Sequence, residues 1–114
     1  MSDDSIYSVK EVVAAIDQLH GRTVRIACVL NIEFEGDSIW HTPKAERLPD
    51  YGSSLWADFD FEAIGCRPQK LEELNGRHVV VVATVDREMQ GHFSLWPGSV
   101  TIQSVAKGKG GPAA

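Results

Sequence analysis

The chain of 114 residues has only two cysteines, Cys28 and Cys66, which are far apart and form no metal-ligand pattern. Small domains that depend on disulfides usually carry more bridges, and structural zinc sites need closely spaced Cys or His pairs. Cys28 lies in an apolar alternation, which favours a buried free thiol over a disulfide. The sequence therefore predicts no metal site and no cofactor.

The sequence also lacks a long apolar segment. No run approaches the roughly 20 residues that a membrane-spanning helix needs. The first residues, Met1 to Ser5, are acidic and contain no apolar signal core. These two absences predict a cytoplasmic protein that has no membrane contact.

Positive charge is scarce, with 11 Lys and Arg against 16 Asp and Glu, which gives a net charge of −5. Binding to a nucleic-acid backbone requires a basic face, so this balance disfavours a nucleic-acid-binding protein. It leaves open a basic stripe formed by Arg22, Arg25, Arg77 and Arg87. The acidity suits a basic protein partner, although solubility alone explains it as well.

No catalytic set is evident. No Ser has the strand–elbow–helix context of an acyl-transfer nucleophile, and no Gly-rich phosphate loop precedes a helix. Asp58, Asp60 and Glu62 alternate, which is more typical of a solvated strand face than of a cation site. An enzyme would need His41 or His92 to converge with Asp58. The favoured interpretation is that the protein is not an enzyme.

What the sequence does contain is a repeat. Leu-His-Gly-Arg-Thr-Val-Arg-Ile (19–26) recurs as Leu-Asn-Gly-Arg-His-Val-Val-Val (74–81), and Gly36 to Trp40 resembles Gly91 to Trp96 with one residue inserted. Each copy predicts a turn, a long strand, a hairpin with glycine and a second strand that ends in Trp. Two such ribbons are expected to share one core.

Before the first copy, Ser8 and Glu11 form a capping box, and apolar residues at helical spacing predict a helix over 8–20. From Val24 the apolar period changes to two, which predicts strands. The predicted strands are 24–34, 39–41, 54–59, 79–85 and 92–95, and 100–105 continues the sheet after a break or bulge at Pro97-Gly98. A connector over 61–74 ends in a short helix. Residues 1–106 then form one domain, and 107–114 a flexible tail.

This order predicts a mostly β protein, a five-stranded OB-like Greek-key barrel, with an N-terminal helix and a short helix between strands three and four. The motif Leu-Asn-Gly-Arg-x-Val-x-Val-x-Ala-Thr-Val, closed by Gly91-His92 to Ser99-Val100, resembles a set of small bacterial OB-like domains. The resemblance spans Leu19 to Val105. This chain departs from it at Ser94 and at Trp96-Pro97. Those domains have no assigned chemistry, so the resemblance implies a fold and no activity.

Residues 42–53 form a long stretch without periodicity, which is unusual in a small domain and often functional. Tyr, Trp and Arg dominate the energetics of protein interfaces, and the stretch and its borders carry several. The predicted binding residues are Trp40, His41, Lys44, Arg47, Tyr51 and Trp56. The alternatives are that the loop is merely tolerated and that the tryptophans pack in the core or stack on bases.

Acidity and the lack of a catalytic set favour a non-enzymatic OB-like binding protein that contacts another protein. A compact, acidic protein of this kind could be an immunity-type inhibitor that protects its own cell from a toxin. The alternative is a single-stranded nucleic-acid-binding OB module, which would need a basic stripe that the net charge conceals.

Overall fold

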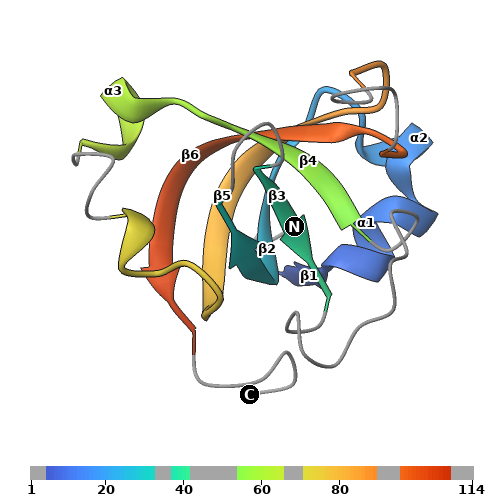
Figure 1. The fold of residues 1–114 in the computed structure, drawn as a ribbon. Coiled ribbons are helices and arrows are strands. Elements are labelled where there is room, and N and C mark those ends of the chain that lie inside the picture. The colour runs from blue at the N-terminus through green and yellow to red at the C-terminus, as the bar shows by residue number, and fades with distance from the viewer. Residues whose placement is uncertain (1–4, 33–36, 42–53, 66–70, 90–95, 109–114) are drawn as a thin grey trace.

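The computed structural model describes residues 5–32, 37–41, 54–65, 71–89 and 96–108. The chain folds mainly into β-strands (Figure 1). In chain order the elements are β1 (Ile6–Ser8), α1 (Val9–Ala14), α2 (Ile16–Leu19), β2 (Thr23–Asn31), β3 (Ser38–Trp40), β4 (Ser54–Phe59), α3 (Phe61–Ile64), β5 (His78–Asp86) and β6 (Ser99–Lys107).

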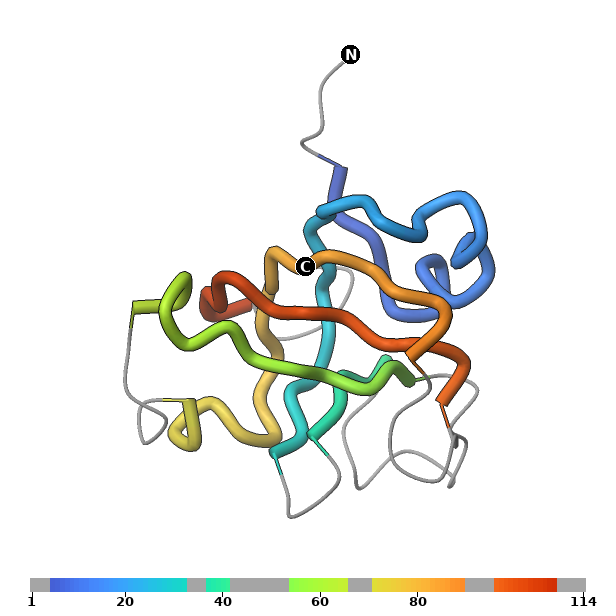
Figure 2. The backbone as a smooth tube through the Cα atoms, turned by 90° about the horizontal axis from the view of Figure 1, so that it is seen from above, coloured from blue at the N-terminus to red at the C-terminus, as the bar shows by residue number. Residues whose placement is uncertain are grey.

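Five of the strands close into a barrel. The order is β2–β3–β4–β6–β5, and β5 pairs back with β2. The β4–β6 pair is parallel and the other four pairs in the ring are antiparallel. Figure 2, viewed from above, shows β4 and β6 side by side where they cross over β2. The predicted OB-like barrel, with a helix before it and a short helix between its third and fourth strands, is confirmed.

The barrel interior is filled by alternate residues of the strands. Along β5 every second residue from Val79 to Val85 is buried, because successive side chains of a strand point to opposite faces. Burying a Val, Leu or Ile side chain contributes about 1.5–3 kcal/mol. The core cluster is formed by Val9, Val12, Leu19, Ile26, Cys28, Leu30, Ile39, Leu55, Ala57, Val79, Val81, Ala83, Val85, Val100 and Ile102.

Cys28 is a buried free thiol, as predicted. Burial raises the pKa of the Cys28 thiol far above its usual value, because the thiolate would lose its hydration. Cys28 is therefore an inert core residue rather than a nucleophile. Cys66 lies outside the described residues.

The predicted helix over 8–20 begins where expected but is divided. Ser8 Oγ accepts from Glu11 N at 3.1 Å and Glu11 Oε1 accepts from Ser8 N at 2.7 Å, so the capping box is confirmed. The helix breaks at Ala15, whose φ and ψ are −109° and 24°. The break has a packing reason, because α1 contacts β4 whereas α2 contacts β5. One straight helix would not bury apolar residues against both strands.

Three further features differ from the sequence prediction: a short strand, the position of a helix and the end of the last strand. The short strand β1, parallel to β2, was not predicted, because three residues are too few to show a period. The helix of the connector, α3, follows β4 directly, although Leu71 and Glu72 near the connector's end are also helical. Lys107 ends β6 rather than beginning a tail. Residues 109–114 of that tail lie outside the described residues.

The first part of the repeat forms two equivalent turns, which we call the first turn (19–22) and the second turn (74–77). Gly21 and Gly76 have φ angles of 81° and 78°, a region that favours glycine. Arg22 N donates to Leu19 O at 2.9 Å and Arg77 N donates to Leu74 O at 3.0 Å. The two copies therefore share one local conformation.

Each turn also joins the far end of the other long strand. Gly21 N donates to Val85 O and Gly76 N donates to Leu30 O, both at 2.7 Å. Val85 N returns a bond to Arg22 O at 3.0 Å, and Leu30 N returns one to Arg77 O at 3.1 Å. The β2–β5 pair thus has approximate two-fold symmetry about the facing residues Ile26 and Val81.

The symmetry does not extend to the second half of the repeat. Ser38 faces Asn31 on β2, and the corresponding position beside Asp86 on β5 holds Ser99. Trp96 precedes β6, so its predicted equivalence to Trp40 is wrong. The physical reason is Pro97, which has no backbone N–H for a strand ladder and delays the start of β6. The predicted strand 92–95 lies outside the described residues.

Candidate functional site

Of the six predicted binding residues, Lys44, Arg47 and Tyr51 lie outside the described residues. Trp40 lies in β3 and is only 7% exposed. Its indole Nε1 donates to Ser38 Oγ at 2.7 Å, so its polar atom is used within the fold. Trp40 therefore packs inside the protein and offers little surface to a partner.

Trp56 lies within β4 and is half-buried. Its ring meets that of Trp96 edge to face, with centroids 5.0 Å apart and planes at 70°. Such a pair adds about 0.5–1.5 kcal/mol beyond the area it buries. Trp56 Nε1 also donates to Asp58 Oδ1 at 3.2 Å. Of the two tryptophans predicted to bind a partner, Trp40 is almost fully buried and Trp56 remains partly exposed.

His41 follows β3 and is half-buried, and its Nδ1 has no hydrogen-bond partner among the described residues. Burial lowers the pKa of His41, Lys10 lowers it further, and Glu11 acts in the opposite direction. The ring is therefore neutral at neutral pH. Its electrostatic neighbours come from the start of α1, far away in sequence.

The structure does not bring His41 and Asp58 together. In the antiparallel β3–β4 pair, Trp40 faces Ser54 and Ser38 faces Trp56. His41 therefore lies at one end of the pair and Asp58 at the other. These two side chains cannot act as a catalytic pair, and His92 lies outside the described residues.

The outer face of β3 and β4 corresponds to the face on which OB-folds bind oligonucleotides. Ser38 and Ser54 on this face are fully buried, as Trp40 nearly is. Neither β3 nor β4 contains Lys or Arg. Of the other β4 residues on this face, Trp56 is half-buried and Asp58 is exposed, so the open part of the two strands carries an acidic and no basic side chain.

The proposed basic stripe is divided as well. Arg22 and Arg87 lie near one end of the β2–β5 pair, Arg25 lies within β2 opposite Val82, and Arg77 lies at the other end, beside Leu30. Arg87 is paired with Asp17, with Nη1 and Oδ1 3.0 Å apart. Arg77 is therefore separated from Arg22 and Arg87, which lie at the opposite end of the pair.

A different surface, at the end of β4, combines aromatic and acidic side chains. We call residues 58–62 the α3 surface. Phe61 is 44% exposed and stacks on the half-buried Phe59, with ring centroids 5.8 Å apart. Asp58, Asp60 and Glu62 beside them are exposed carboxylates. The alternation predicted a solvated strand face, but of the three carboxylates only Asp58 lies in a strand, and Phe61 was not among the predicted binding residues.

The α3 surface is held in place by its backbone. Asp60 N donates to Ile102 O at 2.9 Å, which ties the start of α3 to β6. Asp60 Oδ1 accepts from Ala63 N at 3.1 Å and caps the helix. Gly65, with a φ of 73°, ends it. The Asp-x-x-Ala cap and the following glycine are the sequence signals that could have located this helix.

Within the described ranges, no group of three or more His, Cys, Asp or Glu side chains could hold a metal ion. No helix in this part of the chain has the length and apolar character needed to cross a membrane. Comparison with models of protein families, with curated proteins and with solved structures gave no match for the chain. The class is therefore defined by geometry alone: an OB-like β-barrel with a leading helix.

Proposed function

We propose that this protein is a non-enzymatic binding protein whose partner is another protein with a basic contact surface. The observation that carries this proposal is the α3 surface, a segment of five residues in which the exposed Phe61 stacks on Phe59 and in which Asp58, Asp60 and Glu62 are exposed. Aromatic side chains are enriched in protein interfaces, and most of the binding energy comes from a few such residues.

The chemistry of the α3 surface suits Lys and Arg on the partner. An Arg or Lys of the partner can lie over the face of Phe61, an interaction of about 0.5–2 kcal/mol. The neighbouring carboxylates, together with the net charge of −5, would speed association with a basic protein. The backbone contacts of α3 pre-organise these side chains, which lowers the entropic cost of binding.

The narrower role that we propose is that of an immunity-type inhibitor, which covers a basic toxin and so protects the cell that makes it. Acidity and a preformed contact surface support this role. The alternative, a single-stranded nucleic-acid-binding module, has less support. The corresponding strands β3 and β4 contain no Lys or Arg and expose Asp58, and Arg77 lies at the opposite end of the β2–β5 pair from Arg22 and Arg87.

The test begins with capture of partners from the native host by the whole chain, followed by affinity measurements with the purified partner. Phe61→Ala is expected to weaken binding about tenfold or more, since truncated interface anchors commonly cost over 1 kcal/mol. Asp58→Asn combined with Glu62→Gln is expected to slow association, most clearly at low salt. Asp60 is left unchanged because it caps α3.

Two variants serve as matched controls. Met89 is exposed to a similar degree, 50%, and Met89→Ala removes an apolar side chain elsewhere. Glu72→Gln with Glu73→Gln removes two exposed charges away from α3. Both should bind normally. Equal loss in the controls, or salt-dependent binding of single-stranded DNA in place of a protein, would reject the proposal.

A further inference from the structure

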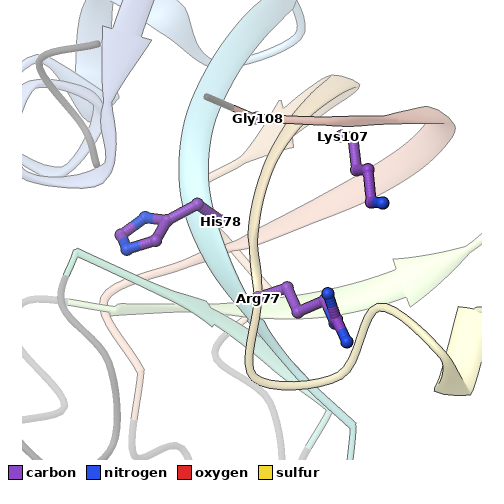
Figure 3. Close-up of a pocket in the computed structure, with 4 residues that line it drawn as sticks. All are labelled: Arg77, His78, Lys107 and Gly108. Carbon is purple, nitrogen blue, oxygen red and sulfur yellow. The ribbon is translucent and has the colours of Figure 1, made fainter. Parts of the chain in front are cut away.

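A surface hollow of about 250 Å³ lies beside the second turn (Figure 3). Among the described residues it is lined by Arg77, His78, Lys107 and Gly108. Arg77 precedes β5 and Lys107 ends β6, so the hollow lies where these two neighbouring strands meet. Figure 3 shows the Arg77 and Lys107 side chains extending to the same side, whereas the His78 ring extends to the other.

Two cations thus lie at one hollow of an acidic protein. Neither Arg77 nor Lys107 forms an ion pair with any described residue, and both are exposed. Neighbouring like charges repel, and an anion between them would relieve this repulsion. The charges of the hollow are therefore opposite in sign to those of the α3 surface.

The backbone that carries these cations is fixed. Arg77 N donates to Leu74 O, and Arg77 O accepts from Leu30 N. Gly108 N donates to His78 O at 2.9 Å. A Cβ at Gly108 would lie only 3.0 Å from His78 C and O, so the absence of a side chain lets the two strand ends approach.

We propose that this hollow binds a single phosphate group, either as the free ion or as a small phosphomonoester. The guanidinium of Arg77 offers parallel N–H donors that match two phosphate oxygens, and the ammonium of Lys107 adds a second point charge. A carboxylate carries one charge and satisfies only one of the two cations. The hollow is slightly smaller than the usual range for drug-sized ligands, which suits a small ligand.

The approximate symmetry of the barrel supplies a matched control. Arg22 occupies in the first turn the position that Arg77 occupies in the second, with the same backbone bonds and an exposed side chain. General attraction of phosphate to arginine would act at both residues, whereas a site requires Arg77 alone.

The experiment is an NMR titration of the whole chain with inorganic phosphate at neutral pH and constant ionic strength, with sodium chloride as the compensating salt. We expect saturable shifts at the amides of Arg77, His78 and Gly108. Arg77→Gln and Lys107→Gln should each weaken binding about tenfold, since each removes one charge-assisted contact to the phosphate. Arg22→Gln should bind phosphate as the wild type does.

A second arm uses glycerol phosphate in place of inorganic phosphate. Tighter binding of glycerol phosphate than of inorganic phosphate would identify a phosphomonoester as the ligand. Equal or weaker binding of glycerol phosphate would identify the free ion. Amide shifts that never saturate, or equal weakening by Arg22→Gln and Arg77→Gln, would overturn the proposal. Unchanged melting temperatures of the variants will establish that a loss of binding does not reflect unfolding.

Discussion

The first and second turns have the same backbone and different surroundings. In both, a glycine with positive φ follows a residue whose side chain accepts a backbone hydrogen bond: His20 Nδ1 from Arg87 N at 3.2 Å, and Asn75 Oδ1 from Ile32 N at 2.8 Å. Around the first turn charges of both signs are mixed, with the Asp17–Arg87 ion pair. Beside the second turn lie Arg77 and Lys107, which pair with no described carboxylate.

This difference separates the parts of the repeat that build the barrel from the parts that are free to acquire a site. Leu, Gly and Arg recur because they set the turn and its junction with the neighbouring strand. The residues around that framework can differ without altering it. In the proposed phosphate site, the repeated Arg77 acquires a role only through a neighbour outside the repeat, Lys107.

The largest expected effect comes from the centre of the symmetry. Ile26 and Val81 face each other, and neither is exposed. Ile26→Ala should lower the free energy of unfolding by about 2–5 kcal/mol through lost burial and a cavity. Val81→Ala removes fewer methyl groups and should cost less. Urea denaturation measures both, and a change below about 1 kcal/mol for Ile26→Ala would contradict a shared central core.

The next effect tests whether the turns are equivalent. Gly21→Ala and Gly76→Ala place a Cβ in open space, so any cost arises from positive φ. Each should destabilise the protein by about 1–2 kcal/mol, and by similar amounts. Gly65→Ala, with a φ of 73° at the end of α3, is the control for strain outside the repeat. Clearly unequal losses at Gly21 and Gly76 would show that the turns are not energetically alike.

A smaller effect should distinguish the two turns. Asn75 makes two bonds with the backbone of Ile32, at 2.8 and 3.1 Å, whereas His20 makes one with Arg87 N. Asn75→Ala should therefore cost about 1–2 kcal/mol and His20→Ala about half of that. Thermal denaturation of the two variants measures this difference. A greater loss at His20 would reverse the ranking.

The Asp17–Arg87 ion pair should contribute least at neutral pH. Both side chains are largely exposed, so the pair is expected to stabilise the protein by about 0.5 kcal/mol or less. A double-mutant cycle of Asp17→Asn and Arg87→Gln at low and high salt isolates this energy. A coupling that is large or insensitive to salt would mean that the first turn depends on its charges.

His41 follows β3, a strand outside the symmetric β2–β5 pair. Its titration should affect stability only in mild acid. Its pKa is lowered in the folded protein, so the unfolded chain binds a proton first. Stability should be constant above the unfolded pKa of about 6.5, fall as the pH drops through that value, and level off below the folded pKa. His41→Gln should reduce this loss. An unchanged pH profile in that variant would exclude His41 as its source.

Local patterns predicted the framework well. The capping box at Ser8, the alternation in β2 and the turn glycines follow from side-chain chemistry that acts within a few residues. The division of the helix at Ala15 could not be predicted, since it depends on packing against two different strands. Strand β1 was missed because its pairing with β2, rather than its own sequence, makes it a strand.

The candidate sites were harder to predict than the fold. The predicted binding residues were chosen for residue type near a long loop, but Trp40 proved to be buried by its position on β3. Phe61 gave no periodic signal, because it lies in a single turn of helix. Lys107 and Arg77 are distant in sequence, and only the β5–β6 register, which places Lys107 beside Val79, brings them together.

The sequence by itself determined where the long strands β2 and β5 lie, where the paired turns occur and that buried residues alternate along the strands, because these properties depend on interactions between near neighbours in the chain. Tertiary structure alone decided which side chains share a surface. The antiparallel pairing of β5 with β6, and the parallel entry of β6 beside β4, bring together residues that no local pattern connects. The acidic α3 surface and the basic hollow both depend on those long-range contacts.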